Sequence, residues 1–278
     1  MPKIVFCGYG KLGHDCLDML VQEGYNICFV LTHKDLSENS VDLYAREKDI
    51  PFFYNDLRKD DNIENIQEVS QDSQLVSINY RFILPKDFFS RFKYALNIHG
   101  SLLPKYRGRT PHVWSIINGE KYSGITCHLI DEGIDTGAII KQEEIEIAKK
   151  DTGYTLLKKY ESRYPKLLKE SLELLKSGIV PTPQNHNKAS FFGKREAIMG
   201  YINFYDKAVN VINFIRAQAE PYPGAYCYLN NGKKFIIDEI QIDKSSSIEL
   251  NSIGVPILFD NIYYVKCIDA KLRVIKYR

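Results

Sequence analysis

Three polar residues, Asn97, His99 and Asp135, have types and spacing that suit them to act together on one substrate. Asn97 and His99 end an apolar stretch, and because side chains alternate along a strand, the amide and the imidazole should emerge on the same face. Asp135 follows in the turn-rich DEGIDTG, from where a sheet can return it to the histidine. An imidazole accepts a proton near neutral pH, and an amide donates hydrogen bonds. The three residues therefore predict acid-base chemistry assisted by hydrogen bonding.

The elements that must position these residues alternate between strand and helix. Apolar runs typical of strands lie at residues 4–7, 26–31, 75–78 and 95–98, and helical patterns lie at residues 12–22 and 41–48. This alternation predicts βαβ units in a largely parallel sheet. Open α/β sheets bind ligands at the carboxyl ends of their strands, where Asn97 and His99 fall. We therefore expect a Rossmann-like, mostly parallel α/β domain.

A second, smaller domain is expected after this sheet. Further strands are predicted at residues 125–130 and 138–147, and a helical pattern at residues 154–176 should be kinked or divided at Pro165. The PTP tripeptide at residues 181–183 indicates a boundary. Beyond it lie one helical run and five short β-rich segments, at residues 208–217, 225–229, 235–240, 255–259, 263–268 and 272–277. We predict a catalytic domain over residues 1–185 and a β-rich C-terminal domain over residues 186–278.

Composition and charge narrow the class of protein. The 278 residues include 37 Lys and Arg against 35 Asp and Glu, a net charge of +2, which gives no support for binding nucleic acid or a membrane surface. The six cysteines form no C-x-x-C pair, which favours reduced thiols over a disulfide framework or a zinc site. The sequence shows no basic leader and no apolar run of about 20 residues. We expect a soluble cytoplasmic protein without a metal.

The glycine-rich GYGKLG at residues 8–13 matches the G-x-G-x-x-G dinucleotide-binding fingerprint between a strand and a helix. Such a site also needs an acidic residue about 20 positions later, which holds the ribose. Thr32 and His33 occupy that place, and Asp35 lies past the strand. We therefore expect the glycines to allow a tight turn and close packing rather than nicotinamide binding, although the turn and Tyr9 could contact a phosphate or sugar.

The run LNIHGSLLPKYRG, followed by GITCHLIDEGIDTGAII, resembles the formyltransferases that use N10-formyltetrahydrofolate. The resemblance covers roughly residues 1–185, and the family includes methionyl-tRNA, glycinamide ribonucleotide and nucleotide-sugar N-formyltransferases. Asn97, His99 and Asp135 match its catalytic residues position by position. The resemblance implies that an amine attacks the formyl carbon. Asn97 would stabilise the oxyanion, His99 would accept the amine's proton or help to hold the oxyanion, and Asp135 would orient the imidazole.

The same resemblance implies where the cosubstrate N10-formyltetrahydrofolate binds. SINYRFILP resembles the family segment that holds the pterin, and residues 131–134 should form the other side of the slot. The expected contacts are Tyr80, Phe82, Ile83, Leu84, Asp131 and Ile134. A core strand end explains the hydrophobicity of this segment equally well.

The remaining histidines receive no catalytic role from the sequence. For His128 we expect a structural hydrogen bond rather than catalysis. We assign no function to His14, His33, His112 or His186.

The C-terminal part bears on which amine is formylated. Residues 201–278 contain 10 Lys and Arg against 8 Asp and Glu, which disfavours a tRNA acceptor. The segment FFGKREAIMGYINFYDKAVNVINFIRAQAEPYPGAYCYL resembles the second domain of the nucleotide-sugar N-formyltransferases, although its end departs from a full OB-fold pattern. We expect formylation of a dTDP-, UDP- or GDP-linked amino-dideoxy sugar for surface glycans such as the O-antigen of lipopolysaccharide. The alternatives are a methionyl-tRNA formyltransferase, a non-catalytic folate- or nucleotide-sugar-binding module, and a nicotinamide oxidoreductase.

Basic and aromatic side chains are candidates for contacting the acceptor, because Lys and Arg suit phosphates and aromatic rings suit sugar or base faces. The candidates are Tyr9, Lys11, Ser101, Lys105, Arg107, Trp114, Lys194, Arg195 and Tyr222. Each alone is also compatible with a solvated surface residue or a core aromatic. The β-rich domain is a candidate surface for a homodimer, and we expect neither nucleic acid nor a membrane as a partner.

Overall fold

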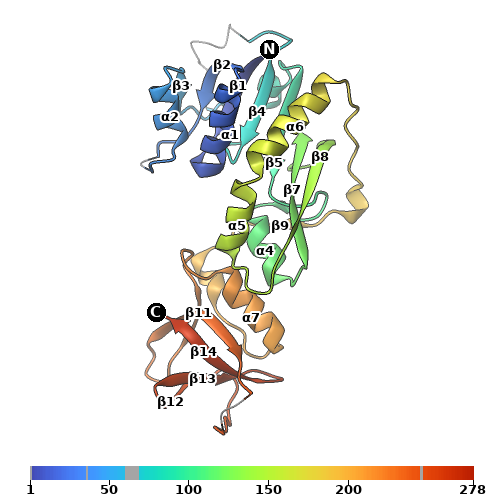
Figure 1. Cartoon of the computed structure of the whole chain (residues 1–278). Helices are drawn as coiled ribbons and strands as arrows, with labels where there is room; N and C mark the ends of the chain where they lie inside the picture. Colours follow the sequence, from blue (N-terminus) through green and yellow to red (C-terminus); the bar gives the residue numbers. More distant parts are fainter. Residues whose placement is uncertain (1, 36, 60–68, 245–246) are drawn as a thin grey trace. The chain divides into compact units, whose positions relative to one another are not determined.

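The computed structural model describes residues 2–35, 37–59, 69–244 and 247–278 (Figure 1). The chain forms two compact units and passes between them several times. The first unit comprises Met1–Arg107, Gly124–Glu144 and Lys159–Phe191, and the second comprises Gly108–Ser123, Ile145–Lys158 and Phe192–Arg278. The domain boundary expected between residues 185 and 186 stays a prediction.

The first unit is built on a mostly parallel sheet with the strand order β3-β2-β1-β4-β5-β7-β8. The strands are β1 (Lys3–Gly8), β2 (Asn26–Leu31), β3 (Phe52–Phe53), β4 (Gln74–Ile78), β5 (Tyr94–His99), β7 (Tyr122–Leu129) and β8 (Ile139–Glu146). The five strands β1 to β5 are parallel to one another, and β7 runs antiparallel to β5. This arrangement confirms the expected Rossmann-like α/β fold.

Helices follow several strands of this sheet, and all of them except α3 (Lys86–Phe89) match helical patterns in the sequence. They are α1 (Gly10–Gln22), α2 (Val41–Glu47), α3 (Lys86–Phe89), α5 (Gly153–Glu161) and α6 (Tyr164–Lys176). The helical pattern at 154–176 is divided, because α5 ends at Glu161 and Pro165 lies in the first turn of α6. Proline has no N–H to donate, and the first turn is the one part of a helix where that group has no intrahelical partner. Helix α6 packs against α1.

The strand order reverses between β1 and β4, which makes this pair of strands the switch point of the sheet. The glycine turn after β1 lies there, and the Tyr9 N–H donates to the Ile78 carbonyl at 3.2 Å. Gly10 adopts a φ of 61°, and a Cβ on Gly13 would lie 2.9 Å from the Val41 Cγ2 atom. Two of the three glycines are thus required by backbone conformation or close packing, as the sequence analysis expects.

The second unit combines helices with an antiparallel sheet, and its segment Ile145–Lys158 includes most of α5. Its elements are α4 (Pro111–Ile117), η3 (Ala197–Gly200), α7 (Ala208–Ala217), β10 (Ala225–Tyr228), β11 (Lys234–Ile242), β12 (Ile257–Phe259), β13 (Ile262–Lys266) and β14 (Lys271–Tyr277). The strand order is β10-β11-β14-β13-β12, and α7 packs on β11 over an apolar core. This sheet confirms the predicted β-rich C-terminal part.

Three short elements complete the described chain. Strands β6 (Arg107–Gly108) and β9 (Phe191–Phe192) pair with each other where the chain passes from one unit to the other, and η2 (His186–Lys188) lies in the first unit. Across the residues that the structure describes, no helix is both long enough and apolar enough to cross a membrane.

Candidate functional site

Two neighbouring strands of the first unit bring polar side chains together at one edge of the sheet. Strand β5 carries Asn97 and His99, and in its antiparallel register with β7 they lie opposite His128 and Thr126. Because Asn97 and His99 are two positions apart on a strand, both side chains lie on one face of the sheet. The pair therefore reaches the carboxyl end of β5, as predicted from the sequence.

His128 is a fixed, neutral hydrogen-bond acceptor for Asn97. Its Nδ1 atom lies 2.7 Å from the Leu129 carbonyl oxygen, so this nitrogen carries the proton and donates it. Its Nε2 atom then accepts from the Asn97 Nδ2 atom at 3.1 Å. Burial lowers the pKa of His128 to about 4, partly opposed by the charge of Asp135, which keeps the ring neutral near pH 7. The bond orients the Asn97 amide and uses one of its two N–H groups.

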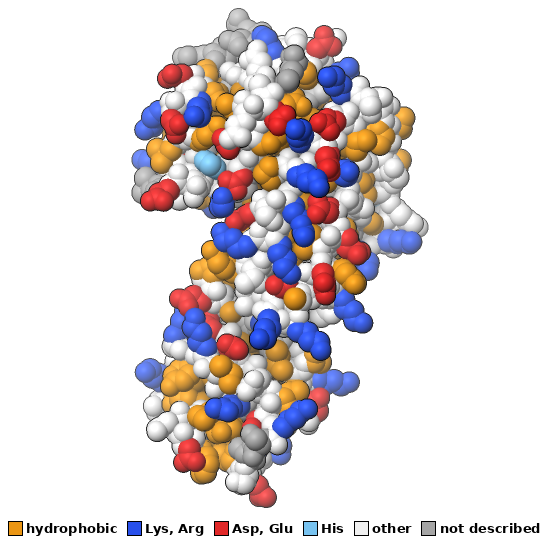
Figure 2. Space-filling view, viewed as in Figure 1, with side chains coloured by type: hydrophobic (Ala, Val, Ile, Leu, Met, Phe, Trp, Pro, Cys, Tyr) orange, Lys and Arg blue, Asp and Glu red, His pale blue; other side chains and the backbone are white. Residues whose placement is uncertain are grey.

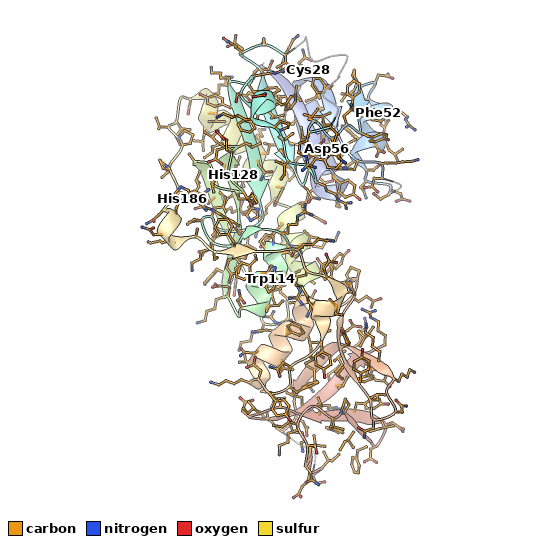
Figure 3. The ribbon with its side chains drawn as sticks, turned by 180° about the vertical axis from the view of Figure 1, so that it is seen from behind. Cys28, Phe52, Asp56, Trp114, His128 and His186 are labelled. Carbon is orange, nitrogen blue, oxygen red and sulfur yellow. The ribbon has the colours of Figure 1, made fainter. Side chains whose placement is uncertain are left out.

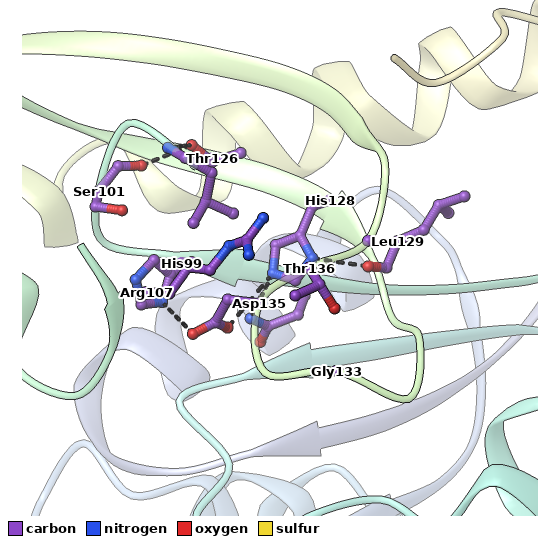
Figure 4. A network of polar contacts seen from close by, with 12 residues as sticks. His99, Ser101, Arg107, Thr126, His128, Leu129, Gly133, Asp135 and Thr136 are labelled. Carbon is purple, nitrogen blue, oxygen red and sulfur yellow. Dashed lines mark hydrogen bonds and ion pairs between the residues drawn. The ribbon is translucent and has the colours of Figure 1, made fainter. Parts of the chain in front are cut away.

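His99 presents one nitrogen to the protein backbone and the other to a carboxylate (Figure 4). Its Nε2 atom donates to the Tyr106 carbonyl oxygen at 2.7 Å, and its Nδ1 atom lies 3.5 Å from the Asp135 Oδ2 atom. The ring is 7% exposed. Because Nε2 keeps its proton, Nδ1 is the nitrogen that can take a proton from a reacting group. The resulting positive charge would be stabilised by Asp135.

Asp135 lies between the two histidines, in the loop between β7 and β8. Its Oδ1 atom is 3.7 Å from the His128 Nε2 atom, so the carboxylate faces both rings. Hydrogen bonds inside the loop join the Asp131 Oδ1 atom to the Gly133 N–H at 3.1 Å and to the Thr136 hydroxyl at 2.5 Å. Lys86 of α3 forms an ion pair with Glu132 of the same loop. The structure therefore brings the predicted Asn97, His99 and Asp135 together from the end of strand β5 and the loop between β7 and β8.

The residues after β5 form a closely bonded loop next to His99. The buried Ser101 donates its hydroxyl to the Lys105 carbonyl at 2.6 Å, while Lys105 itself is exposed. The Thr126 hydroxyl donates to the Ser101 carbonyl at 2.6 Å, which joins the loop to β7. Arg107 is buried, and burial lowers its pKa while the charges of Asp135 and Asp131 oppose that shift. Ser101, Lys105 and Arg107 are all predicted acceptor contacts, and of these three Lys105 is the exposed one.

The predicted cosubstrate contacts lie on the loops that follow β4 and β7. Ile83 and Ile134 are 63% and 61% exposed, whereas Tyr80 and Leu84 pack against the apolar core. Exposed isoleucines at the ligand-binding edge of a sheet offer apolar surface to a ring system. The Asp131 carboxylate is also exposed at this edge.

An aromatic cluster occupies the same edge around His33, a residue without a predicted role. The His33 ring centroid lies 4.5 Å from Phe82, 5.0 Å from Tyr80 and 5.4 Å from Tyr9. The Arg81 N–H donates to the His33 Nε2 atom at 3.2 Å, and the Arg81 guanidinium covers the Tyr9 ring at 3.7 Å. The cluster joins the loops after β1, β2 and β4.

The other predicted acceptor contacts divide between the two units. Lys11, in the first unit, is exposed at the start of α1 and pairs with Asp15 at 2.7 Å. Trp114 of α4 (Figure 3), Lys194, Arg195 and Tyr222 lie in the second unit. There the Arg195 guanidinium lies over the Trp114 ring at 4.8 Å, and the Tyr222 hydroxyl is 3.0 Å from the His112 Nε2 atom. Their part in acceptor binding stays a prediction.

Known protein families match both parts of the chain. The family model "Formyl transferase" matches residues 3–172. The family model "Formyl transferase, C-terminal domain" matches residues 195–278. The chain belongs to the formyl transferase family. Within the residues that the structure describes, no group of three or more His, Cys, Asp or Glu side chains is placed to hold a metal ion.

Solved formyltransferase structures have the same fold. WlaRD, a sugar 3N-formyl transferase crystallised with dTDP and 5-N-formyl-THF, is 23% identical, with a TM-score of 0.77 over 99% of this chain and 97% of its own. An N-formyltransferase from Helicobacter canadensis, in complex with folinic acid and dTDP-3-aminofucose, is 24% identical, with a TM-score of 0.78 over the whole of both chains. A sugar N-formyltransferase from a Shewanella species is 21% identical, with a TM-score of 0.67 over 85% of this chain and 96% of its own.

Several groups in the site of this formyl transferase were not assigned from the sequence. The Tyr106 carbonyl fixes the His99 ring, and Gln184 donates from its Nε2 atom to the carbonyls of Asp135 and Gly137 at 2.9 and 2.7 Å. A backbone carbonyl carries no sequence signature. Gln184 lies in the PTPQNH segment, whose composition indicates only a boundary.

The depressed pKa of His128 predicts how stability changes with pH. The folded protein holds the ring neutral down to about pH 4, whereas the unfolded chain protonates it near pH 6.5, so the unfolded state binds more protons between these values. Stability should therefore fall as the pH is lowered from about 6.5 towards 4. His112, whose pKa burial also lowers to about 4, acts in the same direction. An NMR titration of the His128 Cε1 proton checks this, and a midpoint at or above 6.5 would contradict it. His128→Asn should reduce the loss of stability over this range.

Proposed function

We propose that this formyl transferase moves the formyl group of N10-formyltetrahydrofolate to the amino group of a nucleotide-linked amino-dideoxy sugar. The observation that carries the proposal is the oriented Asn97 amide beside the His99 and Asp135 pair, in a chain whose two parts both match formyl transferase domains. The folate and dTDP-aminosugar ligands of the similar structures support the two substrate classes.

The site residues fit each step of an amide-forming transfer. The cosubstrate supplies an activated formyl carbon, which the acceptor amine attacks. Asn97 donates its second N–H to the oxygen on which negative charge develops. The His99 Nδ1 atom takes the proton lost by the amine, and Asp135 stabilises the imidazolium. As the bond between the formyl carbon and N10 breaks, the same Nδ1 atom returns a proton to N10. The acceptor then carries the formyl group as an amide.

The edge between the loops after β4 and β7 suits the cosubstrate. The exposed side chains of Ile83 and Ile134 offer apolar contact, and backbone groups beside Phe82 and Leu84 can read the edge of a ring. Tyr80 and Asp131 complete the proposed set.

An amino sugar is favoured over transfer RNA as the acceptor. On the face shown in Figure 2, Asp and Glu side chains lie among the Lys and Arg side chains, and the whole chain has a net charge of only +2, which gives little support for binding a phosphate backbone. Formylated amino sugars of this class would enter surface glycans such as lipopolysaccharide O-antigen. All six cysteines are buried free thiols, which supports a reducing compartment such as the cytoplasm.

The substrate proposal predicts product formation with one class of acceptor. Protein incubated with N10-formyltetrahydrofolate and a panel of dTDP-, UDP- and GDP-linked 3- and 4-amino sugars should convert at least one to its formamide, detected by mass spectrometry. Matched sugars with a hydroxyl in place of the amine should stay unchanged. Activity on initiator tRNA, with none on any amino sugar, would contradict the proposal.

The roles of the site residues predict distinct losses of turnover. His99→Ala should lower kcat by about 10²- to 10⁴-fold, because the proton acceptor is lost, and Asn97→Ala by about 10²- to 10³-fold, because the oxyanion loses a donor. Circular dichroism should show that both variants stay folded. His14→Ala, a histidine change on α1 outside the site, serves as the control. Wild-type turnover in folded His99→Ala protein would rule out this mechanism.

We also propose a homodimer formed through the antiparallel sheet of the second unit. Strand β12 is at the edge of that sheet, and its residues Ile257, Leu258 and Phe259 are all exposed. An exposed apolar edge strand is a template for pairing with a second chain.

The dimer proposal predicts that one surface charge changes the oligomeric state. Leu258→Lys should shift the protein from dimer to monomer in light scattering coupled to gel filtration, because Leu258 is 54% exposed on the edge strand. Val209→Lys, at a position of α7 that is 57% exposed, should leave the dimer intact. A wild-type monomer at working concentration would refute the proposal.

A further inference from the structure

Arg107 is a buried charge whose hydrogen bonds lead towards the site. Its side chain is 2% exposed, and its Nε and Nη2 atoms donate to the Gln184 Oε1 atom at 3.2 and 2.6 Å. Nη2 also lies 3.2 Å from the His186 Nδ1 atom, and the guanidinium faces the Phe191 ring at 5.3 Å. A buried charge is costly unless its donors are satisfied, so these contacts hold the guanidinium in one position.

Arg107 decides which way the Gln184 amide points. A guanidinium only donates, so it can pair with the amide oxygen and not with the amide nitrogen. The Gln184 Nε2 atom must then point the other way, where it donates to the Asp135 and Gly137 carbonyls at 2.9 and 2.7 Å. Gln184 is 6% exposed, so solvent does not readily replace either bond.

These two carbonyls belong to a part of the loop between β7 and β8 that combines an unfavourable backbone conformation with close packing. Asp135 has a φ of 54°, in the left-handed region that a non-glycine residue adopts only at a cost. Two residues later a Cβ on Gly137 would lie 1.9 Å from the Leu129 carbonyl oxygen, so the chain is tightly packed there. The side chain of Asp135 reaches both His99 and His128 from this backbone conformation.

The segment that carries Gln184 is itself fixed to the sheet. Thr182 and Ile139 exchange two backbone hydrogen bonds of 2.8 Å, which attach the segment to the start of β8. The segment that the sequence predicts to be a boundary thus contacts the loop between β7 and β8, which carries Asp135.

We propose that Gln184, oriented by the buried Arg107, is a positioning residue that holds Asp135 in its left-handed conformation and so places the carboxylate against His99. The inference rests on the proposed function, in which Asp135 stabilises the protonated His99. It adds two residues that act through Asp135 rather than on the substrates. Arg107, a candidate acceptor contact in the sequence, receives a different role here.

The kinetic test uses Gln184→Glu, which keeps an oxygen for Arg107 and removes both N–H donors to the loop. We expect kcat to fall by about 10- to 100-fold, while the KM of the sugar changes less than about threefold. Gln22→Glu is the control, because it is the same substitution at an exposed position of α1, where Gln22 donates to the Asp18 carboxylate at 2.8 Å. It should keep kcat within about twofold of wild type.

A double-mutant cycle separates positioning from general damage. In an Asp135→Asn background, assayed by single turnover, Gln184→Glu should cost less than about twofold, because the carboxylate it positions is already gone. An equal loss in both backgrounds would overturn the proposal. Arg107→Met, which removes the orienting donors, should show the same dependence on Asp135.

A second measurement does not need activity. In protein labelled with ¹⁵N-histidine, Gln184→Glu and Asp135→Asn should shift the His99 ring nitrogens in the same direction, and Gln22→Glu should not. Unmoved His99 signals in folded Gln184→Glu protein would overturn the positioning role. If the wild type formylates no amino sugar, the proposed function fails while these shifts still decide whether Gln184 positions Asp135.

Discussion

The Asp135 carboxylate, placed against two imidazole rings, is the interaction on which the site depends. It lies 3.5 Å from His99 and 3.7 Å from His128, and it comes from a residue with a left-handed backbone. Gln184, far along the chain, ties the loop backbone at two carbonyls. The site is therefore a property of the whole first unit.

The two histidines near Asp135 have different functions because their other hydrogen bonds differ. His128 donates from Nδ1 to a carbonyl, and burial keeps the ring neutral, so its remaining nitrogen accepts from Asn97. His99 donates from Nε2 to a carbonyl, and its remaining nitrogen faces the carboxylate. One ring thus orients the Asn97 amide, while the other presents a nitrogen to the Asp135 carboxylate. Two rings of the same chemistry are distinguished by which nitrogen the backbone engages.

The glycine turn after β1 shows how a fold feature can resemble a ligand signature. Its glycines satisfy a positive φ and a contact with Val41. Strand β2 ends at Leu31, so Thr32 and His33 stand where a dinucleotide site needs a carboxylate. His33 instead packs among Phe82, Tyr80 and Tyr9. The turn still lies at the switch point of the sheet, which is where an α/β fold binds its ligands.

The sequence by itself determined the strand and helix pattern and the division of the long helix near Pro165, and it predicted Asn97, His99 and Asp135 as site residues. These follow from local periodicity, from the missing N–H of proline and from two motifs, each of which is continuous in the chain. Only the tertiary structure decided that His128 orients Asn97, that Arg107 is buried and that Gln184 reaches Asp135. Hydrogen bonds between residues dozens of positions apart leave no local pattern, because they depend on where the sheet brings each loop.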